Sequence, residues 1–462
     1  MSAWETVIGL EIHAHLKTRT KMFCRCATGF GEPPNTLTCP VCLAHPGTLP
    51  VPNRTAVEWT IKLGLALGCE IAEEAVFSRK HYFYPDSPKG YQISQYDEPL
   101  CVDGRFVVPG EDGFEVGIVR AHLEEDAAKT VHLQGTGGRI VGATRSLVDF
   151  NRGGTPLVEI VTQPDLRSAD DARRFLQLLR QTIVELGISD AEMEKGTLRC
   201  DANVSVRRPG EGYRTRWELK NMNSFSFIAR GIDAAVLAQI ALHEAGEEVV
   251  QETYDYDADH DTLTPHRSKE EAEDYRYFPE PDLAPVEPDA AMVDRARAEL
   301  PELPGMRIAR HSEELGAGDA WTLVTTGRES KLDGLVAGGL DPRTAFNQVM
   351  NRDIPADPNW TELARVYAAS GLTAGAVEAA TAASADPGFT ADEYLAQKAV
   401  SDTSELEPLI DRILAENPGQ VAAYRGGKEG LIGFFVGQAM KETGGKANPK
   451  VLNELIREKL NA

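Results

Sequence analysis

The segment Val7-Ile8-Gly9-Leu10-Glu11-Ile12-His13-Ala14-His15-Leu16 decides the expected fold of the N-terminal part of the chain. Successive side chains of a strand point to opposite faces, so one face carries Ile8, Leu10, Ile12 and Leu16. The other face carries Glu11, His13 and His15. The pattern predicts a half-buried strand with three titratable groups on its polar side. A solvated surface and a metal or acid/base site are both open interpretations of that side.

Around this strand, short alternating segments and turns continue to about Pro288, and Ala-rich segments of helical length follow from Met292. We therefore expect an α+β fold: an antiparallel-sheet domain at 1–291, an all-helical domain at 292–400 and a small helical tail at 401–462. Helices are expected after the capping residue Ser168 up to Gly187, and from about Phe227 to Ala245. The polar, acidic stretch from Glu252 to Tyr277 is expected to be a long loop.

The composition and charge of the chain limit which partners it can bind and where in the cell it is expected. The chain has 462 residues and a formal net charge of -23, so any contact with nucleic acid must be local. It begins without a basic and apolar leader, and no uninterrupted apolar stretch approaches the length of a membrane span. These features predict a soluble, cytoplasmic protein that is not bound to a membrane.

Two further segments place carboxylates where a strand should be apolar. Residues 118–126 alternate until three acids meet, and Glu125 falls in the register of the apolar Val119, Ala121 and Leu123. Glu159 interrupts the apolar run of residues 157–161. A carboxylate that faces inward requires a partner, and a cation is the simplest one.

A polar floor is predicted from two strands joined by the turn at residues 209–212. One strand carries Arg199, Asp201, Asn203 and Ser205 on its polar face, and the next carries Arg216, Glu218 and Lys220. An ordinary exposed sheet face is the alternative. Together with Glu11, His13, Glu125 and Glu159, the floor favours a site for Mg²⁺ and nucleotide phosphates. Because no Walker loop occurs, ATP would be held through Lys89, Arg152 and Lys220.

Four of the seven cysteines lie within nineteen residues of one another, as Cys24-Arg25-Cys26 and Cys39-Pro40-Val41-Cys42. Four thiolates with a Cys-x-x-Cys knuckle suit tetrahedral zinc, and four protein ligands leave no open position, so the predicted role is structural. A redox pair is the alternative, but it needs a strand-to-helix context.

Longer stretches resemble the GatB family. The resemblance rests on residues 7–13, Tyr84-Pro85-Asp86-Ser87-Pro88-Lys89-Gly90-Tyr91, His122-Leu123-Glu124-Glu125-Asp126, Asp149-Phe150-Asn151-Arg152-Gly153-Gly154-Thr155-Pro156, Leu198-Arg199-Cys200-Asp201, Glu218-Leu219-Lys220-Asn221 and Asp274-Tyr275-Arg276-Tyr277-Phe278-Pro279-Glu280-Pro281-Asp282. In the tail, residues 433–441 and 445–449 are similar to the family's tRNA-binding module. The similarity covers nearly the whole chain.

The resemblance implies a cradle-shaped kinase domain in which ATP activates the side-chain carboxylate of mischarged Glu-tRNA(Gln) or Asp-tRNA(Asn) for amidation. It implies Mg²⁺ ligation by His13, Glu125 and Glu159, with Glu11 and Glu124 close by. Arg152, Arg199, Asp201, Glu218 and Lys220 would form the wider nucleotide and phosphate site, and Lys89 would contact substrate or phosphate. The tail, with net charge +3 over residues 420–462, would bind tRNA through Lys428, Lys441, Lys446 and Lys450.

The sequence has no Ser-rich amidase signature that could supply ammonia. The resemblance therefore implies a GatA-type glutaminase partner and a small GatC-type partner. Two other functions remain open: an ATP-dependent ligase that amidates a free amino acid, and a zinc-containing tRNA-binding scaffold without catalysis. The scaffold leaves Glu11, Glu125 and Glu159 without a role.

Overall fold

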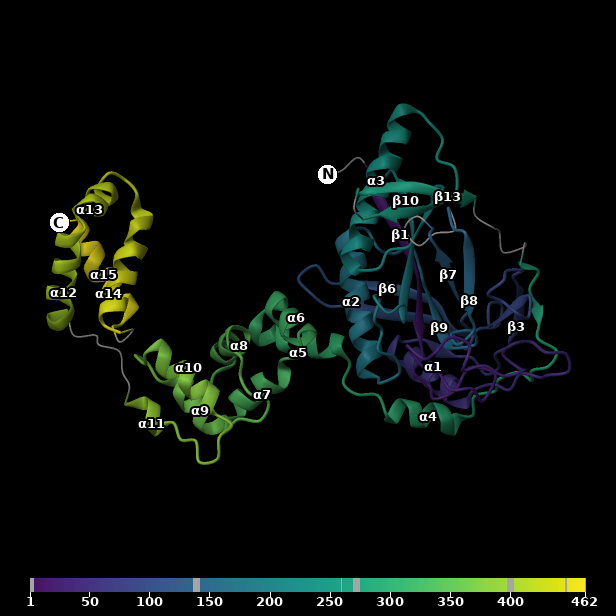
Figure 1. The fold of residues 1–462 in the computed structure, drawn as a ribbon, viewed down its shortest axis with the longest axis horizontal. Coiled ribbons are helices and arrows are strands. Elements are labelled where there is room, and N and C mark those ends of the chain that lie inside the picture. The colour runs from purple at the N-terminus through teal and green to yellow at the C-terminus, as the bar shows by residue number, and fades with distance from the viewer. Residues whose placement is uncertain are drawn as a thin grey trace. The chain divides into compact units, whose positions relative to one another are not determined.

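The computed structural model describes residues 4–135, 142–258, 260–268, 275–396, 403–444 and 447–461. The chain divides into two compact units, 1–309 and 310–462 (Figure 1). The first unit includes α4 (Ala290–Ala298), which packs against α1 (Arg54–Ala66) and lies mostly beyond residue 291. The combination of a large sheet with many helices confirms the expected α+β class.

A twelve-stranded sheet dominates the first unit. Along its main path the strands are β13 (Thr262–Ser268), β12 (Glu252–Asp257), β11 (Trp217–Lys220), β10 (Leu198–Arg207), β1 (Glu5–His15), β9 (Pro156–Thr162), β6 (Phe114–Glu125), β4 (Tyr91–Ser94), β3 (Ser78–His81) and β14 (Phe278–Pro279). Beside this path, β5 (Cys101–Val108) pairs with β6 and with β2 (Glu70–Ile71). A separate hairpin joins β7 (Lys129–Leu133) and β8 (Arg145–Asp149).

The first strand of the chain lies in the middle of this sheet. β1 pairs antiparallel with β10 on one side and with β9 on the other. Ile8, Leu10 and Ile12 are at most 1% exposed, as the period-two pattern predicted. Replacing one of these side chains by Ala would destabilise the unit by roughly 2–5 kcal/mol.

Helices cover the apolar side of the sheet. α2 (Ala169–Glu185) begins after Ser168, whose Oγ accepts from Asp171 N, and Gly187 follows it at φ +73°. α3 (Phe225–Ala245) ends at Gly246 in the left-handed conformation and packs against α2 and β10. Both helix predictions are confirmed, and Figure 1 shows α3 alongside β10.

α3 is the one helix among the described residues that is long and apolar enough to cross a bilayer, a candidate that the sequence pattern did not reveal. It is nevertheless part of the folded unit, because Gln239 Nε2 donates to Val204 O of β10 at 2.9 Å. Ile228, Ile232 and Ala235 are fully buried on the same side. These contacts are those of a helix that packs against a sheet.

The prediction of a long loop from Glu252 to Tyr277 is wrong for residues 252–257 and 262–268, which form strands. β12 pairs in parallel with β11, and β13 pairs antiparallel with β12. The polar composition concealed a strand, because Thr253 and Asp255 belong to the polar side of the sheet, where hydrophilic side chains are required. Residues 269–274 lie outside the described part of the chain.

The second unit is helical in its described residues. Its helices are α6 (Ala317–Thr325), α7 (Glu329–Ala337), α8 (Pro342–Asn351), α9 (Trp360–Ala368), α10 (Ala374–Ala383), α11 (Asp392–Leu395), α12 (Thr403–Glu416), α13 (Pro418–Arg425), α14 (Ile432–Glu442) and α15 (Pro449–Asn461), and α5 (Pro304–Leu315) spans the division between the units. One buried cluster runs from Leu315 to Ala391 and another from Leu406 to Leu460. The expected division at residue 400 lies in a stretch that is not described.

Candidate active site and cysteine cluster

The register of the central strands gathers polar side chains on one face of the sheet. Residues that pair directly across strands point to the same side. The direct pairs are Thr253 with Glu218, Glu218 with Asn203, Asp201 with Glu11, His13 with Arg199 and Glu159, and Glu159 with His122. The predicted hairpin floor therefore exists and extends across β12, β11, β10, β1, β9 and β6.

His13 lies at the centre of two groups of possible metal ligands. Its ring is within 4.8 Å of ligand atoms of Glu11 and Asp201, and also of Glu124 and Glu159. Its Nε2 is 3.4 Å from Glu11 Oε1, and its Nδ1 is 4.0 Å from Glu159 Oε2. One imidazole thus stands between two pairs of carboxylates.

The local charges set the pKa values in this cluster. Burial would lower the pKa of His13, but Glu11 and Glu159 outweigh it and raise the pKa to about 9. Burial would likewise raise the pKa of Glu11, but the bond to His13 and the charge of Lys220 lower it to about 2. Burial, with the nearby charges of Glu124 and Glu11, raises the pKa of Glu159. The cluster therefore holds more negative charge than its own histidine compensates.

The structure places Glu124, and not Glu125, with His13 and Glu159. Residues 120, 122 and 124 of β6 share the polar face, whereas Glu125, at the end of the strand, is turned toward Lys89 and Ile93 and lines the same cavity. There its carboxylate bonds Lys89 Nζ and accepts from Ile93 N at 3.2 Å. The inward-facing Glu125 does have a cationic partner, and that partner is a lysine ammonium.

The sequence pattern did not single out three residues near the cluster. The His122 ring is 1% exposed, its Nε2 lies 3.5 Å from Glu124 Oε1 and 3.6 Å from Glu159 Oε2, and neither ring nitrogen has a hydrogen bond. The Arg120 guanidinium is 3.6 Å from Glu159. Burial would lower the pKa of Lys80, but the negative charges of Glu124 and Glu159 raise it above its usual range. The alternation of residues 118–126 could have identified Arg120 and His122, because it places them on the same face of the strand as Glu124.

A second cluster surrounds the buried Asp126. His15 Nε2 lies 2.7 Å from Asp126 Oδ2, Arg199 donates to the same oxygen at 2.8 Å, and Arg152 Nε is 3.3 Å from it. Burial would raise the pKa of Asp126, but Arg199, His15 and Arg152 together lower it well below its ordinary range. Asp126 thus orients two guanidinium groups at the edge of the polar face.

The remaining predicted residues of the floor form an ion-pair chain. Lys220 Nζ donates to Asp201 at 2.5 Å and lies 3.3 Å from Glu218, which accepts from Thr253 Oγ1 at 3.0 Å. A cavity of about 1060 Å³ lies over this face. Its walls contain Lys89, Arg152, Arg199, Asp201, Glu218, Lys220, Glu11, His13, Glu124, Glu125 and Glu159. The structure therefore brings all eleven predicted residues to one cavity.

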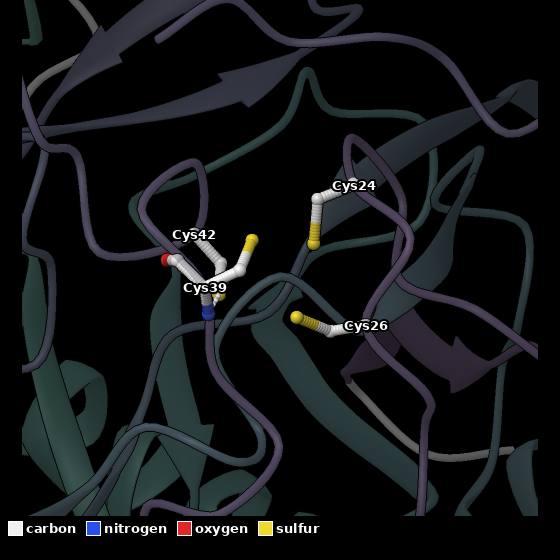
Figure 2. A group of neighbouring side chains, drawn as sticks. All are labelled: Cys24, Cys26, Cys39 and Cys42. Carbon is white, nitrogen blue, oxygen red and sulfur yellow. Dashed lines mark hydrogen bonds between the residues drawn. The ribbon is translucent and has the colours of Figure 1, made fainter.

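The four cysteines predicted to bind zinc converge from two loop segments (Figure 2). Their sulfur atoms lie within 4.8 Å of one another, and the Cys39 and Cys42 sulfurs are 3.9 Å apart. Tetrahedral zinc with Zn–S bonds of about 2.3 Å requires sulfurs about 3.8 Å apart, so the donors fit this ion. Hydrogen bonding from Cys24 is the main reason that the pKa of the Cys42 thiol falls to about 4.

The tail residues predicted to contact RNA lie on its surface. Lys428, Lys441 and Lys450 are exposed, whereas Lys459 bonds Asp411 at 2.6 Å. Lys446 lies outside the described residues.

Comparison with known proteins gives two family matches. Residues 6–294 match the GatB/GatE catalytic domain, and residues 357–460 match the GatB domain. The B subunit of the aspartyl/glutamyl-tRNA(Asn/Gln) amidotransferase from Halorhodospira halophila is 49% identical over 99% of both chains. Proteins with the same name are 46% identical in Anaeromyxobacter dehalogenans strain 2CP-1, over 100% of this chain and 99% of the relative, and 46% identical in Moorella thermoacetica, over 99% and 100%.

Proposed function

This chain belongs to the GatB family of amidotransferase subunits, and from that premise we propose that it uses ATP to activate the side-chain carboxylate of Glu-tRNA(Gln) or Asp-tRNA(Asn). The activated group is then amidated to give Gln-tRNA(Gln) or Asn-tRNA(Asn). The observation that carries this proposal is the cluster of His13, Glu124 and Glu159 on the floor of a large cavity.

The chemistry follows from the poor leaving ability of a carboxylate oxygen. In the proposed first step, a carboxylate oxygen attacks the γ-phosphorus of ATP, the bond to ADP breaks, and an acyl phosphate forms. In the second step, ammonia attacks the carbonyl carbon, inorganic phosphate leaves, and the nitrogen loses a proton. Both steps need cations that neutralise phosphate charge.

The donor set fits a hard cation. Oxygen-rich sites with one or two carboxylates suit Mg²⁺, and His13, Glu124 and Glu159, with Glu11 and Asp201 beside them, would hold it. A Mg²⁺ ion held by these residues would supply positive charge that offsets the negative charge of the ATP phosphates. We assign Glu124 to this site in place of Glu125, which the family resemblance implied, because the Glu125 carboxylate is bonded to Lys89.

The basic side chains would contact the phosphates and the substrate. Lys80 and Arg120 lie beside Glu124 and Glu159, so they could offset the charge of the transferred phosphoryl group. Asp201 holds the ammonium of Lys220, and Asp126 holds the guanidinium of Arg199. Arg152 is held by Asp126 and by two backbone carbonyls. We assign Lys89 to substrate or phosphate, with Glu125 as the group that holds its ammonium.

Three assignments complete the proposal. The four cysteines bind a structural zinc ion. Residues 1–291 form the cradle-shaped kinase domain, 292–400 a helical domain, and 401–462 a tail that binds tRNA. Ammonia comes from a GatA-type glutaminase in a cytoplasmic heterotrimer that also contains a GatC-type protein, because the chain carries no amidase signature of its own.

The test is an assay of the purified heterotrimer with ATP, glutamine and each mischarged tRNA. We expect ADP and phosphate to appear only with a mischarged tRNA, together with the amidated product. Amidation of free glutamate would favour the ligase that acts on a free amino acid. Binding of tRNA without any ATP cleavage would favour a non-catalytic scaffold.

A further inference from the structure

The turn between β10 and β11 combines basic and aromatic side chains on a strongly acidic protein. Residues 207–216 contain four arginines and one acid, Glu211, whereas the whole chain has a net charge of -23. Tyr213 is 65% exposed, and Arg214 and Arg216 follow it. Tyr213, Arg214 and Arg216 line the same cavity of about 1060 Å³ as the carboxylate cluster. A basic, aromatic turn therefore stands at a wall of the proposed active site.

The turn is held in one conformation by its own contacts. Glu211 accepts from Arg208 N at 3.1 Å and from Arg214 at 2.7 Å. Glu5 of β1 bonds Arg207 at 2.7 Å, and the Arg208 guanidinium lies 3.9 Å from the centre of the Trp4 ring. The turn is thus anchored to the central strand and to the N-terminal segment before any ligand arrives.

Two side chains remain available for a ligand. The Arg207 guanidinium lies 5.2 Å from the Tyr213 ring centre, and most of the tyrosine surface is still exposed. Arg216 is exposed and donates to the neutral amide oxygen of Asn203 at 3.1 Å, so its charge is not offset there. An exposed aromatic ring and an arginine without an acidic partner, both on one turn at the cavity wall, suit a single-stranded nucleic acid, whose bases stack and whose phosphates pair with arginine.

We propose that Tyr213 and Arg216 bind the single-stranded 3′ end of the substrate RNA as it enters the cavity. The proposal rests on the proposed function, in which the reacting carboxylate is esterified to that end. Tyr213 would stack on a base, and Arg216 would contact a phosphate. The favoured partner is RNA and not another protein, because the turn lines the cavity that must admit the reacting end.

The experiment uses the complete heterotrimer and four variants: Tyr213→Ala, Arg216→Ala, and the conservative Tyr213→Phe and Arg216→Lys. The matched control is Arg105→Ala, which removes an exposed arginine that is paired with Glu115 and does not line the cavity. Binding of deacylated tRNA is measured at several salt concentrations. Steady-state amidation gives KM and kcat separately.

Tyr213→Ala is expected to weaken RNA binding and to raise KM roughly 5- to 150-fold, the range for loss of one stacked base, with kcat little changed. Arg216→Ala is expected to reduce the slope of log K against log salt by about 0.7, the value for one single-stranded phosphate contact. Tyr213→Phe and Arg216→Lys should retain most of the binding, and Arg105→Ala should match the wild type.

Unchanged binding and unchanged salt slope in both alanine variants would overturn the proposal. Loss of heterotrimer assembly in them, measured by size-exclusion chromatography, would also overturn it, because the turn would then be a protein interface. A wild-type complex that binds tRNA through this turn but amidates none would contradict the proposed function alone. A complex that binds no tRNA would contradict both.

Discussion

His13 on β1 lies directly opposite Glu159 on β9, and its Nδ1 is 4.0 Å from the nearest Glu159 oxygen. Glu124 completes this group from the neighbouring strand β6. Three strands that are distant in sequence thus supply one group of possible metal ligands.

The first prediction separates Glu124 from Glu125. Glu124→Gln and Glu159→Gln should each reduce tRNA-dependent ATP cleavage about a hundredfold or more, because each removes a formal charge from the proposed Mg²⁺ site. Glu125→Gln should reduce cleavage less and should act mainly through the freed Lys89. The rate of ADP release at several Mg²⁺ concentrations measures this. If Glu125→Gln reduces ATP cleavage more than the other two variants do, Glu125 and not Glu124 is the metal ligand.

The second prediction concerns the cysteine cluster. Freshly purified protein should contain one tightly bound zinc per chain, and Cys39→Ser or Cys42→Ser should lose it. Thermal stability should fall before any specific catalytic defect appears. Cys200→Ser is a control, because this buried cysteine is not part of the cluster. Elemental analysis that finds no zinc in the wild-type protein would refute the assignment.

The third prediction concerns the helical tail. Replacing the exposed Lys428, Lys441 and Lys450 together by Ala should raise KM for mischarged tRNA and flatten its dependence on salt. Lys459→Ala is the control, because this ammonium is already paired with Asp411. Removal of all residues after 400 should have a larger effect of the same kind and leave zinc and ATP binding intact. If the triple variant and the wild type have equal KM values at every salt concentration, the tail does not bind RNA.

The fourth prediction is a pH dependence of stability. Hydrogen bonding from Arg207, with a further contribution from Arg167, lowers the pKa of Glu5 below its usual value of 4.5. A lowered pKa in the folded state stabilises the protein above the unfolded pKa, and this contribution is lost as the pH falls through the folded pKa. Glu5→Gln should therefore lower Tm at pH 7, by the equivalent of about 1 kcal/mol. The difference should shrink toward pH 3, and a constant Tm difference over this range would contradict the prediction.

Local sequence patterns predicted many strands and helices of the first unit correctly. The alternation around Ile12 identified the central strand, Ser168 and Gly187 marked helix ends, and the turn at 209–212 joined two strands of the polar floor. These features depend on the intrinsic geometry of helices, strands and turns.

The structure differs from the expectations where long-range pairing decides the outcome. Glu124 and Glu125 are adjacent, and only the register with β9 shows which of them joins His13. β12 looked like a loop because its polar residues face a floor built from other strands. Lys80 lies in a short strand with a polar sequence, and its position beside Glu124 follows from the pairing of β3, β4 and β6.

The central position of β1 has a consequence for the synthesis of the chain. This strand is translated well before its partners β9 and β10, which begin only at Pro156 and Leu198. At about 5–20 residues per second, the strand waits roughly 10–40 seconds before both neighbours have been translated. During that interval its apolar side, with Ile8, Leu10 and Ile12, has no sheet to join. Until β9 and β10 have been translated, β1 is therefore an apolar strand without its sheet partners, the kind of segment that chaperones protect.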